Sequence, residues 1–92
     1  MRYTVELLAY DERNEDYVCV GQLRDFGLDF KGANEYAKSL AYDHTEDVVA
    51  EVRRRTKTLL PFMVDVNRVH NGYARPMFGY EYDGESVEKV TL

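Results

Sequence analysis

Two dipeptides in the last third of the chain, Asn71-Gly72 and Asp83-Gly84, constrain its fold more than any other sequence feature. Each is a preferred pair for a two-residue β-hairpin loop, because Asn, Asp and Gly readily adopt the positive φ angles that such loops require. The segments on either side are rich in Val, Tyr and Phe, which favour extended chain. We therefore predict a three-stranded antiparallel meander with strands near residues 62–70, 73–82 and 85–92.

The two-residue loops also predict the register of the meander. They place Arg68 opposite Arg75 and, farther from the turn, Val66 opposite Met77. The same register sorts the apolar side chains onto two faces, with Phe62, Val64, Val66 and Met77 on one and Phe78, Tyr80, Tyr82 and Val87 on the other. Because one helix covers only one face of a sheet, the second face needs a second helix or a second copy of the chain. A homodimer is therefore one of the expected assemblies.

The first quarter of the chain has the pattern of another hairpin. In residues 2–10, apolar side chains alternate with polar ones, which is typical of a half-buried strand and places Tyr3, Val5, Leu7 and Ala9 on one side. Residues 11–16 form a charged turn, and residues 17–23 return as a second strand. Cys19 lies within that strand, where we expect a small buried hydrophobe.

An amphipathic helix is predicted for residues 30–42. Apolar residues recur there at spacings of three and four, namely Phe30, Ala33, Ala37, Leu40 and Ala41. Asp29 can cap the helix by accepting a hydrogen bond from a first-turn amide, and Leu28 would pack inward as a hydrophobic staple. We expect this helix to cover one face of the sheet.

Residues 43–60 admit two interpretations. As a helix, they place Val48, Val49, Val52, Thr56, Leu59 and Leu60 in one apolar arc that Pro61 would end. As a strand, the β-branched content of residues 48–52 favours extension, and residues 55–58 turn into the next strand. The balance favours the strand.

The expected fold is a single compact α+β domain over residues 1–92. A small, mostly antiparallel sheet, made of the N-terminal hairpin and the C-terminal meander, packs against one helix, or against two if residues 43–60 are helical. One cysteine cannot form an internal disulfide or a zinc site that needs several thiolates. No stretch approaches the roughly 20 apolar residues of a membrane span, and residues 1–10 lack the pattern of a signal peptide. We expect a cytoplasmic protein that binds no membrane, metal or cofactor.

The net charge of −5 conceals a division along the chain. Residues 1–51 hold 12 acidic and 5 basic residues, a balance of −7. Residues 52–77 hold six basic residues and one acid, or +5, and residues 78–92 add −3. Such a layout predicts a polarised surface that can attract a charged partner.

The predicted register creates one candidate binding site. Like charges directly opposite each other destabilise a sheet, so Arg68 and Arg75 call for a phosphate or carboxylate between them, unless they extend into water or pair with internal acids. Our candidate anion- or partner-binding residues are Arg53, Arg54, Arg55, Arg68, His70, Tyr73 and Arg75. The arginine run, with Lys57, joins this site only if it lies near the hairpin. The acidic candidates for partner binding are Glu12, Glu15 and Asp16.

No catalytic motif accompanies these residues. His44 and His70 are the candidates for a proton carrier near neutral pH, but neither stands in a recognisable acid, base or nucleophile arrangement. We therefore expect a non-catalytic protein-interaction module, such as an accessory or inhibitor protein of a mobile element, that uses acidic loops and a tyrosine-bearing sheet. The alternative is nucleic-acid or anion binding through segment 53–75, against which the negative net charge argues.

Overall fold

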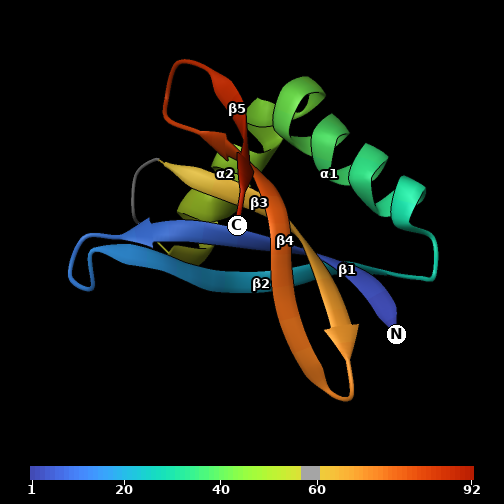
Figure 1. Cartoon of the computed structure of the whole chain (residues 1–92). Helices are drawn as coiled ribbons and strands as arrows, with labels where there is room; N and C mark the ends of the chain where they lie inside the picture. Colours follow the sequence, from blue (N-terminus) through green and yellow to red (C-terminus); the bar gives the residue numbers. More distant parts are fainter. Residues whose placement is uncertain (57–60) are drawn as a thin grey trace.

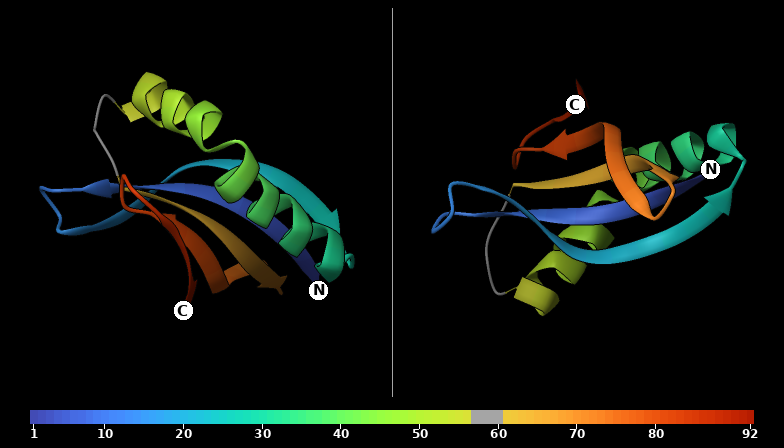
Figure 2. Two further views of the ribbon diagram at one scale, coloured as in Figure 1. Left: turned by 90° about the horizontal axis from the view of Figure 1, so that it is seen from above. Right: turned by 60° about the horizontal axis from the view of Figure 1, so that its bottom comes forward.

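The computed structural model describes residues 1–56 and 61–92 and shows a five-stranded antiparallel sheet with two helices packed on one face (Figures 1 and 2). The strands are β1 (Arg2–Asp11), β2 (Asp16–Gly27), β3 (Phe62–His70), β4 (Tyr73–Tyr82) and β5 (Val87–Thr91). The helices are α1 (Phe30–Asp43) and α2 (Thr45–Thr56). The sheet order is β2-β1-β3-β4-β5, so pairing of β1 with β3 joins the N-terminal hairpin to the meander. The predicted α+β class is confirmed, in its two-helix form.

The strand predicted within residues 43–60 is wrong, because residues 45–56 form α2. Val48 and Val52 lie one turn apart on its inner side and are 6% and 1% exposed. Burial of this stripe outweighs the preference of β-branched residues for extended chain. Acidic residues in the first turn and basic residues in the last turn also match the helix dipole. Lys57, Leu59 and Leu60 lie outside the described residues.

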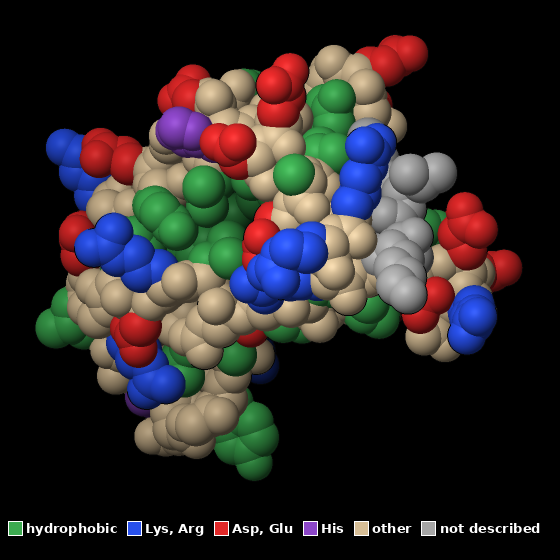
Figure 3. Space-filling view, turned by 180° about the vertical axis from the view of Figure 1, so that it is seen from behind, with side chains coloured by type: hydrophobic (Ala, Val, Ile, Leu, Met, Phe, Trp, Pro, Cys, Tyr) green, Lys and Arg blue, Asp and Glu red, His purple; other side chains and the backbone are tan. Residues whose placement is uncertain are grey.

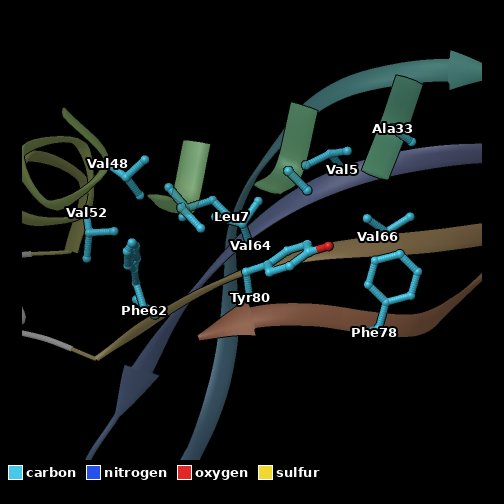
Figure 4. Packing of buried hydrophobic residues seen from close by; sticks show 13 residues of the cluster. Val5, Leu7, Ala33, Val48, Val52, Phe62, Val64, Val66, Phe78 and Tyr80 are labelled. Carbon is cyan, nitrogen blue, oxygen red and sulfur yellow. The ribbon is translucent and has the colours of Figure 1, made fainter. Parts of the chain in front are cut away.

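The core lies between the two helices and the sheet (Figure 4). The alternation predicted for β1 is confirmed, with Val5, Leu7 and Ala9 at most 1% exposed. They pack with residues of β3, β4 and α2, and with a stripe of alanines on α1: Ala33, Ala37 and Ala41. Such small side chains allow the α1 backbone to lie close to the sheet.

The start of α1 confirms the predicted cap but not the predicted staple. The Asp29 carboxylate accepts a hydrogen bond of 2.8 Å from the Gly32 amide. A Cβ at Gly32 would overlap that carboxylate, so the glycine makes room for the cap. Leu28, expected to pack inward, is 75% exposed.

The predicted register of the β3–β4 hairpin is confirmed near the turn and wrong beyond it. Arg68 pairs with Arg75, but Val66 pairs with Phe78 instead of Met77, because β4 contains a bulge between these pairs. The extra residue moves the following side chains to the other face. Phe78, Tyr80 and Tyr82 therefore face the helices, together with Phe62, Val64 and Val66. The aromatic reverse face that motivated a homodimer does not form.

The helix-free face of the sheet is curved rather than flat (Figure 2). Tyr17 of β2 donates a hydrogen bond of 2.7 Å to Glu81 of β4, although β1 and β3 lie between these strands. In a flat sheet, β2 and β4 would be roughly 14 Å apart. The hydrogen bond therefore closes this end of the helix-free face. Neither described helix is long and apolar enough to cross a membrane.

Candidate anion-binding site on the β3–β4 hairpin

The outer part of the β3–β4 hairpin projects from the molecule (Figure 1). Its turn residues Asn71 and Gly72 have φ angles of 50° and 81°, as the sequence predicted for a two-residue hairpin loop. Residues 70–76 are all exposed. A segment that contributes little to the core is thus held rigidly by strand pairing and presented to solvent.

Four predicted site residues meet on this hairpin: Arg68, His70, Tyr73 and Arg75. Arg68 pairs with Arg75, and His70 with Tyr73. With Asn71, the four side chains line an open hollow of about 440 Å³. Tyr73 is 81% exposed, more than any other large hydrophobic residue of the described chain. The arrangement combines two cations with an accessible aromatic ring.

The two guanidinium groups have no counter-ion among the described residues. Two other arginines do have partners: Arg2 forms an ion pair of 2.8 Å with Asp25, and Arg24 stacks on Phe26. Within residues 1–56 and 61–92, neither Arg68 nor Arg75 makes a side-chain hydrogen bond or ion pair, and segment 66–80 contains no acidic residue. Of the two alternatives to a bound anion, the described residues show no pairing with internal carboxylates, whereas extension of both side chains into water agrees with their exposure.

The arginine run of α2 does not extend this site. Arg54 and Arg55 form ion pairs of 2.6 and 2.5 Å with Glu51, and these hydrogen bonds lower the pKa of Glu51 to about 2. Arg55 also donates to the Val20 carbonyl of β2 at 3.0 Å. Arg53 lines a different hollow, between α2 and Tyr82.

Register shows that this run is remote from the hairpin. Gly21, beside the Val20 carbonyl, pairs with Leu7, and Leu7 pairs with Val64. Arg68 lies four residues farther along β3, or roughly 13 Å, and two strands across. The basic segment therefore divides into two parts. On α2, Arg54 and Arg55 have partners within the protein, whereas Arg68 and Arg75 on the hairpin have no ion-pair partner among the described residues.

The acidic candidates Glu12, Glu15 and Asp16 are exposed at the opposite end of the sheet. They lie in or beside the β1–β2 turn, and the β4–β5 turn brings Asp83 and Glu85 to the same end. In the space-filling view, acidic side chains lie at the right and top and also along the left side, with Lys and Arg among them, and the hairpin projects at the bottom (Figure 3). The acidic turns and the hairpin arginines therefore lie at opposite ends of the sheet, while charges of both signs occur elsewhere, such as the Arg2–Asp25 ion pair.

The predicted tyrosine-bearing surface is largely absent. Tyr80 is 3% exposed and donates a hydrogen bond of 2.6 Å to Asn34 of α1. Tyr82 packs on Phe62 and donates to the Gly84 carbonyl. Cys19, expected to be buried, is exposed on β2. Tyr73 therefore carries the aromatic character of the hairpin site by itself.

Sequence reasoning missed a second polar group, centred on Asp65 in the middle of β3. This side chain is 2% exposed, and burial together with the charge of Glu6 raises its pKa to about 7. In the sequence, this group is indicated by an acidic residue within the otherwise apolar run Phe62-Met63-Val64-Asp65-Val66. An ionisable residue inside a buried strand requires a structural or functional explanation.

The chemistry available at the hairpin is binding. Two guanidinium forks can each donate paired hydrogen bonds to a carboxylate or phosphate. Among the described residues, no group of three or more His, Cys, Asp and Glu side chains is arranged to hold a metal ion. His44 makes only an exposed contact of 3.5 Å with Asp47.

Comparisons with known proteins add no further information about this site. No protein-family model matches the chain, and no curated protein or solved structure matches it. The functional argument therefore rests on the geometry of the hairpin.

Proposed function

We propose that this protein is a non-catalytic protein-binding module whose β3–β4 hairpin docks onto carboxylates of an acidic partner surface. One observation carries the proposal: Arg68 and Arg75 are directly opposed and exposed, and no acid of the described chain forms an ion pair with either. A carboxylate between them would relieve their repulsion and accept hydrogen bonds from both. Tyr73 beside them supplies the rigid aromatic contact that is common at protein interfaces.

The charge of the molecule favours a protein partner over a nucleic acid. Proteins that bind nucleic acid tightly neutralise several phosphates, often about six to ten. The hairpin offers two arginines and one histidine, and the net charge is −5. Such a site suits a few carboxylates better than a continuous phosphate backbone. Docking of this kind would serve an adaptor or an inhibitor that covers an acidic surface.

The test uses a short poly-glutamate peptide as the probe and amide NMR shifts as the readout. We expect shifts concentrated at residues 68–75, and a loss of affinity of about tenfold, or ~1.4 kcal/mol, in the double variant Arg68→Gln, Arg75→Gln. The matched control is Arg13→Gln with Arg53→Gln, which removes the same charge from exposed sites elsewhere.

Equal loss of affinity in both double variants would show that net charge alone determines the affinity, and it would overturn the proposal. Tighter binding of a single-stranded oligonucleotide than of the peptide, at the same low salt, would instead support the nucleic-acid alternative.

A further inference from the structure

The Asp65 side chain is buried on the helix-free face, and no described residue forms a hydrogen bond or ion pair with it. Its Oδ1 atom has no hydrogen bond, and no described Lys or Arg forms an ion pair with it. Glu6 of β1 pairs with Asp65 on one side, and Gly79 of β4 pairs with it on the other. The carboxyl therefore lies between a second acid and a bare stretch of backbone.

Gly79 provides the space for this carboxyl. A Cβ at position 79 would overlap Asp65 Oδ1 and would also collide with the Met63 side chain. The missing side chain lets both residues fold over β4. An isolated charge in such a place is costly, whereas a protonated carboxyl is far less so.

The hydrogen bond from Tyr17 to Glu81 lies across this region of the sheet. Glu81 pairs with Met63, two residues from Asp65 on the same face. Tyr17 reaches Glu81 from the edge strand β2, and the charge of Asp65 acts on the Tyr17 hydroxyl. The bridge thus holds the two sides of the curved sheet together above the buried acid.

The titratable groups around Asp65 are acids and phenols from four strands. They are Glu6 and Tyr10 of β1, Tyr17 of β2, Glu81 of β4 and Glu88 of β5, which pairs with Glu81. Burial, followed by the hydrogen bond and charge of Glu81, raises the pKa of Tyr17. Tyr17 therefore remains a proton donor throughout the neutral range, and Asp65 is the group whose charge changes there.

We propose that Asp65 is a proton-operated latch that keeps the helix-free face of the sheet closed. With its proton, Asp65 stays buried and the Tyr17–Glu81 bridge forms above it. Without its proton, the carboxylate is repelled by Glu6 and must gain water. The nearest route for that water opens when Tyr17 leaves Glu81, which frees the end of β2 from β4.

The test follows the Asp65 carboxyl and the Tyr17 ring by NMR between pH 5 and pH 9. We expect both signals to change with one midpoint near 7. Amide protection factors near Tyr17 should fall about fivefold or more above that midpoint. Asp65→Asn should remove both transitions and keep the bridge closed at every pH. Glu6→Gln should move the midpoint to lower pH, and the exposed control Glu12→Gln should not.

Tyr17→Phe separates a latch from a merely buried acid. Without the bridge, water reaches Asp65 more easily, so its midpoint should fall. Titration of Asp65 with no change at Tyr17, or a midpoint below 5 in the wild-type protein, would overturn the proposal.

Discussion

Single residues set the balance between stability and binding in the hairpin. Arg68 and Arg75 are cross-strand partners of like charge, which destabilises the free hairpin, and no described side chain compensates for this. A binding partner that neutralises them recovers the lost free energy. The same repulsion that weakens the free hairpin therefore favours the complex.

Arg75→Glu should change the stability of the free protein and its affinity for carboxylates in opposite directions. The new carboxylate would face Arg68 and form a cross-strand ion pair, so we expect the free energy of unfolding to rise by about 0.5 kcal/mol. Affinity for poly-glutamate should be lost. Urea unfolding measures the first effect and NMR titration the second. A variant that is less stable than the wild type would show that the two side chains do not meet.

Asp65 should make stability depend on pH in the opposite direction to an ordinary ion-paired carboxylate. Its pKa rises from 3.8 to about 7 on folding, so the folded state binds the proton more tightly than the unfolded state does. Stability should therefore decrease as pH rises from about 4 to about 7. Asp65→Asn should remove this slope and gain on the order of 1–2 kcal/mol at pH 8. Denaturant unfolding across this range measures both, and an unchanged slope would contradict the assignment.

At the scale of elements, local chemistry predicted one of the two turns of the meander. The two-residue loop expected at Asp83-Gly84 is wrong, because Tyr82 pairs with Val87 and residues 83–86 form a longer loop. The turn dipeptide Asn71-Gly72 fixed the pairing of Arg68 with Arg75, so the centre of the candidate site could be predicted. The bulge farther along β4 could not be derived from the turn, although Pro76 was a signal for it. Proline lacks the amide proton that a regular ladder requires, and its place in strands is confined to edges and bulges.

Whether residues 45–56 form a helix or a strand depends on tertiary contacts, which the local sequence pattern does not show. Its valines favour a strand locally, and only the burial of Val48 and Val52 against the sheet decides for a helix. Tyr17 was missed for the same reason, since its hydrogen bond to Glu81 depends on the curvature of the sheet.

Two substitutions test the inner face of α2. Val52 is 1% exposed, so Val52→Ala should cost about 2 kcal/mol in the free energy of unfolding. Val49 is half-buried, and Val49→Ala should change stability by less than about 0.5 kcal/mol because alanine also favours the helix. Denaturant unfolding followed by circular dichroism measures both. Equal costs would be inconsistent with the helical arrangement.

Both edges of the sheet are protected by side chains from the helices. Arg55 of α2 donates to the Val20 carbonyl of β2, and Tyr42 of α1 donates to the Val87 carbonyl of β5 at 3.4 Å. Irregular pairing between β1 and β2 further distorts the longer edge. Such features discourage pairing with other chains, so the basic run on α2 has a structural role.

At the scale of the whole molecule, distance separates the two charged ends. β3 spans nine residues between them, about 30 Å, whereas electrostatic screening at physiological salt has a length of about 8 Å. The hairpin can therefore attract carboxylates although the molecule as a whole is negative.

Neutralising the acidic turn should test this separation. The triple variant Glu12→Gln, Glu15→Gln, Asp16→Asn reduces the net charge from −5 to −2. We expect its affinity for poly-glutamate at physiological salt to stay within about twofold of the wild type. A gain of tenfold would show that the acidic end opposes binding at the hairpin. With a natural partner, a loss of affinity would indicate that these acids make contacts of their own.

The interior position of β1, between β2 and β3, has a consequence for how the chain reaches its native state. β1 pairs with β3 through residues such as Ala9 and Phe62, which are more than fifty positions apart in the sequence. The N-terminal hairpin and the meander can each form from nearby residues. The pairing of β1 with β3 forms only after the helical segment between them has brought these two parts together. Because pairings between distant residues are slow to form, the pairing of β1 with β3 should limit the folding rate. Until then, the inner edges of two half-sheets remain open to incorrect partners.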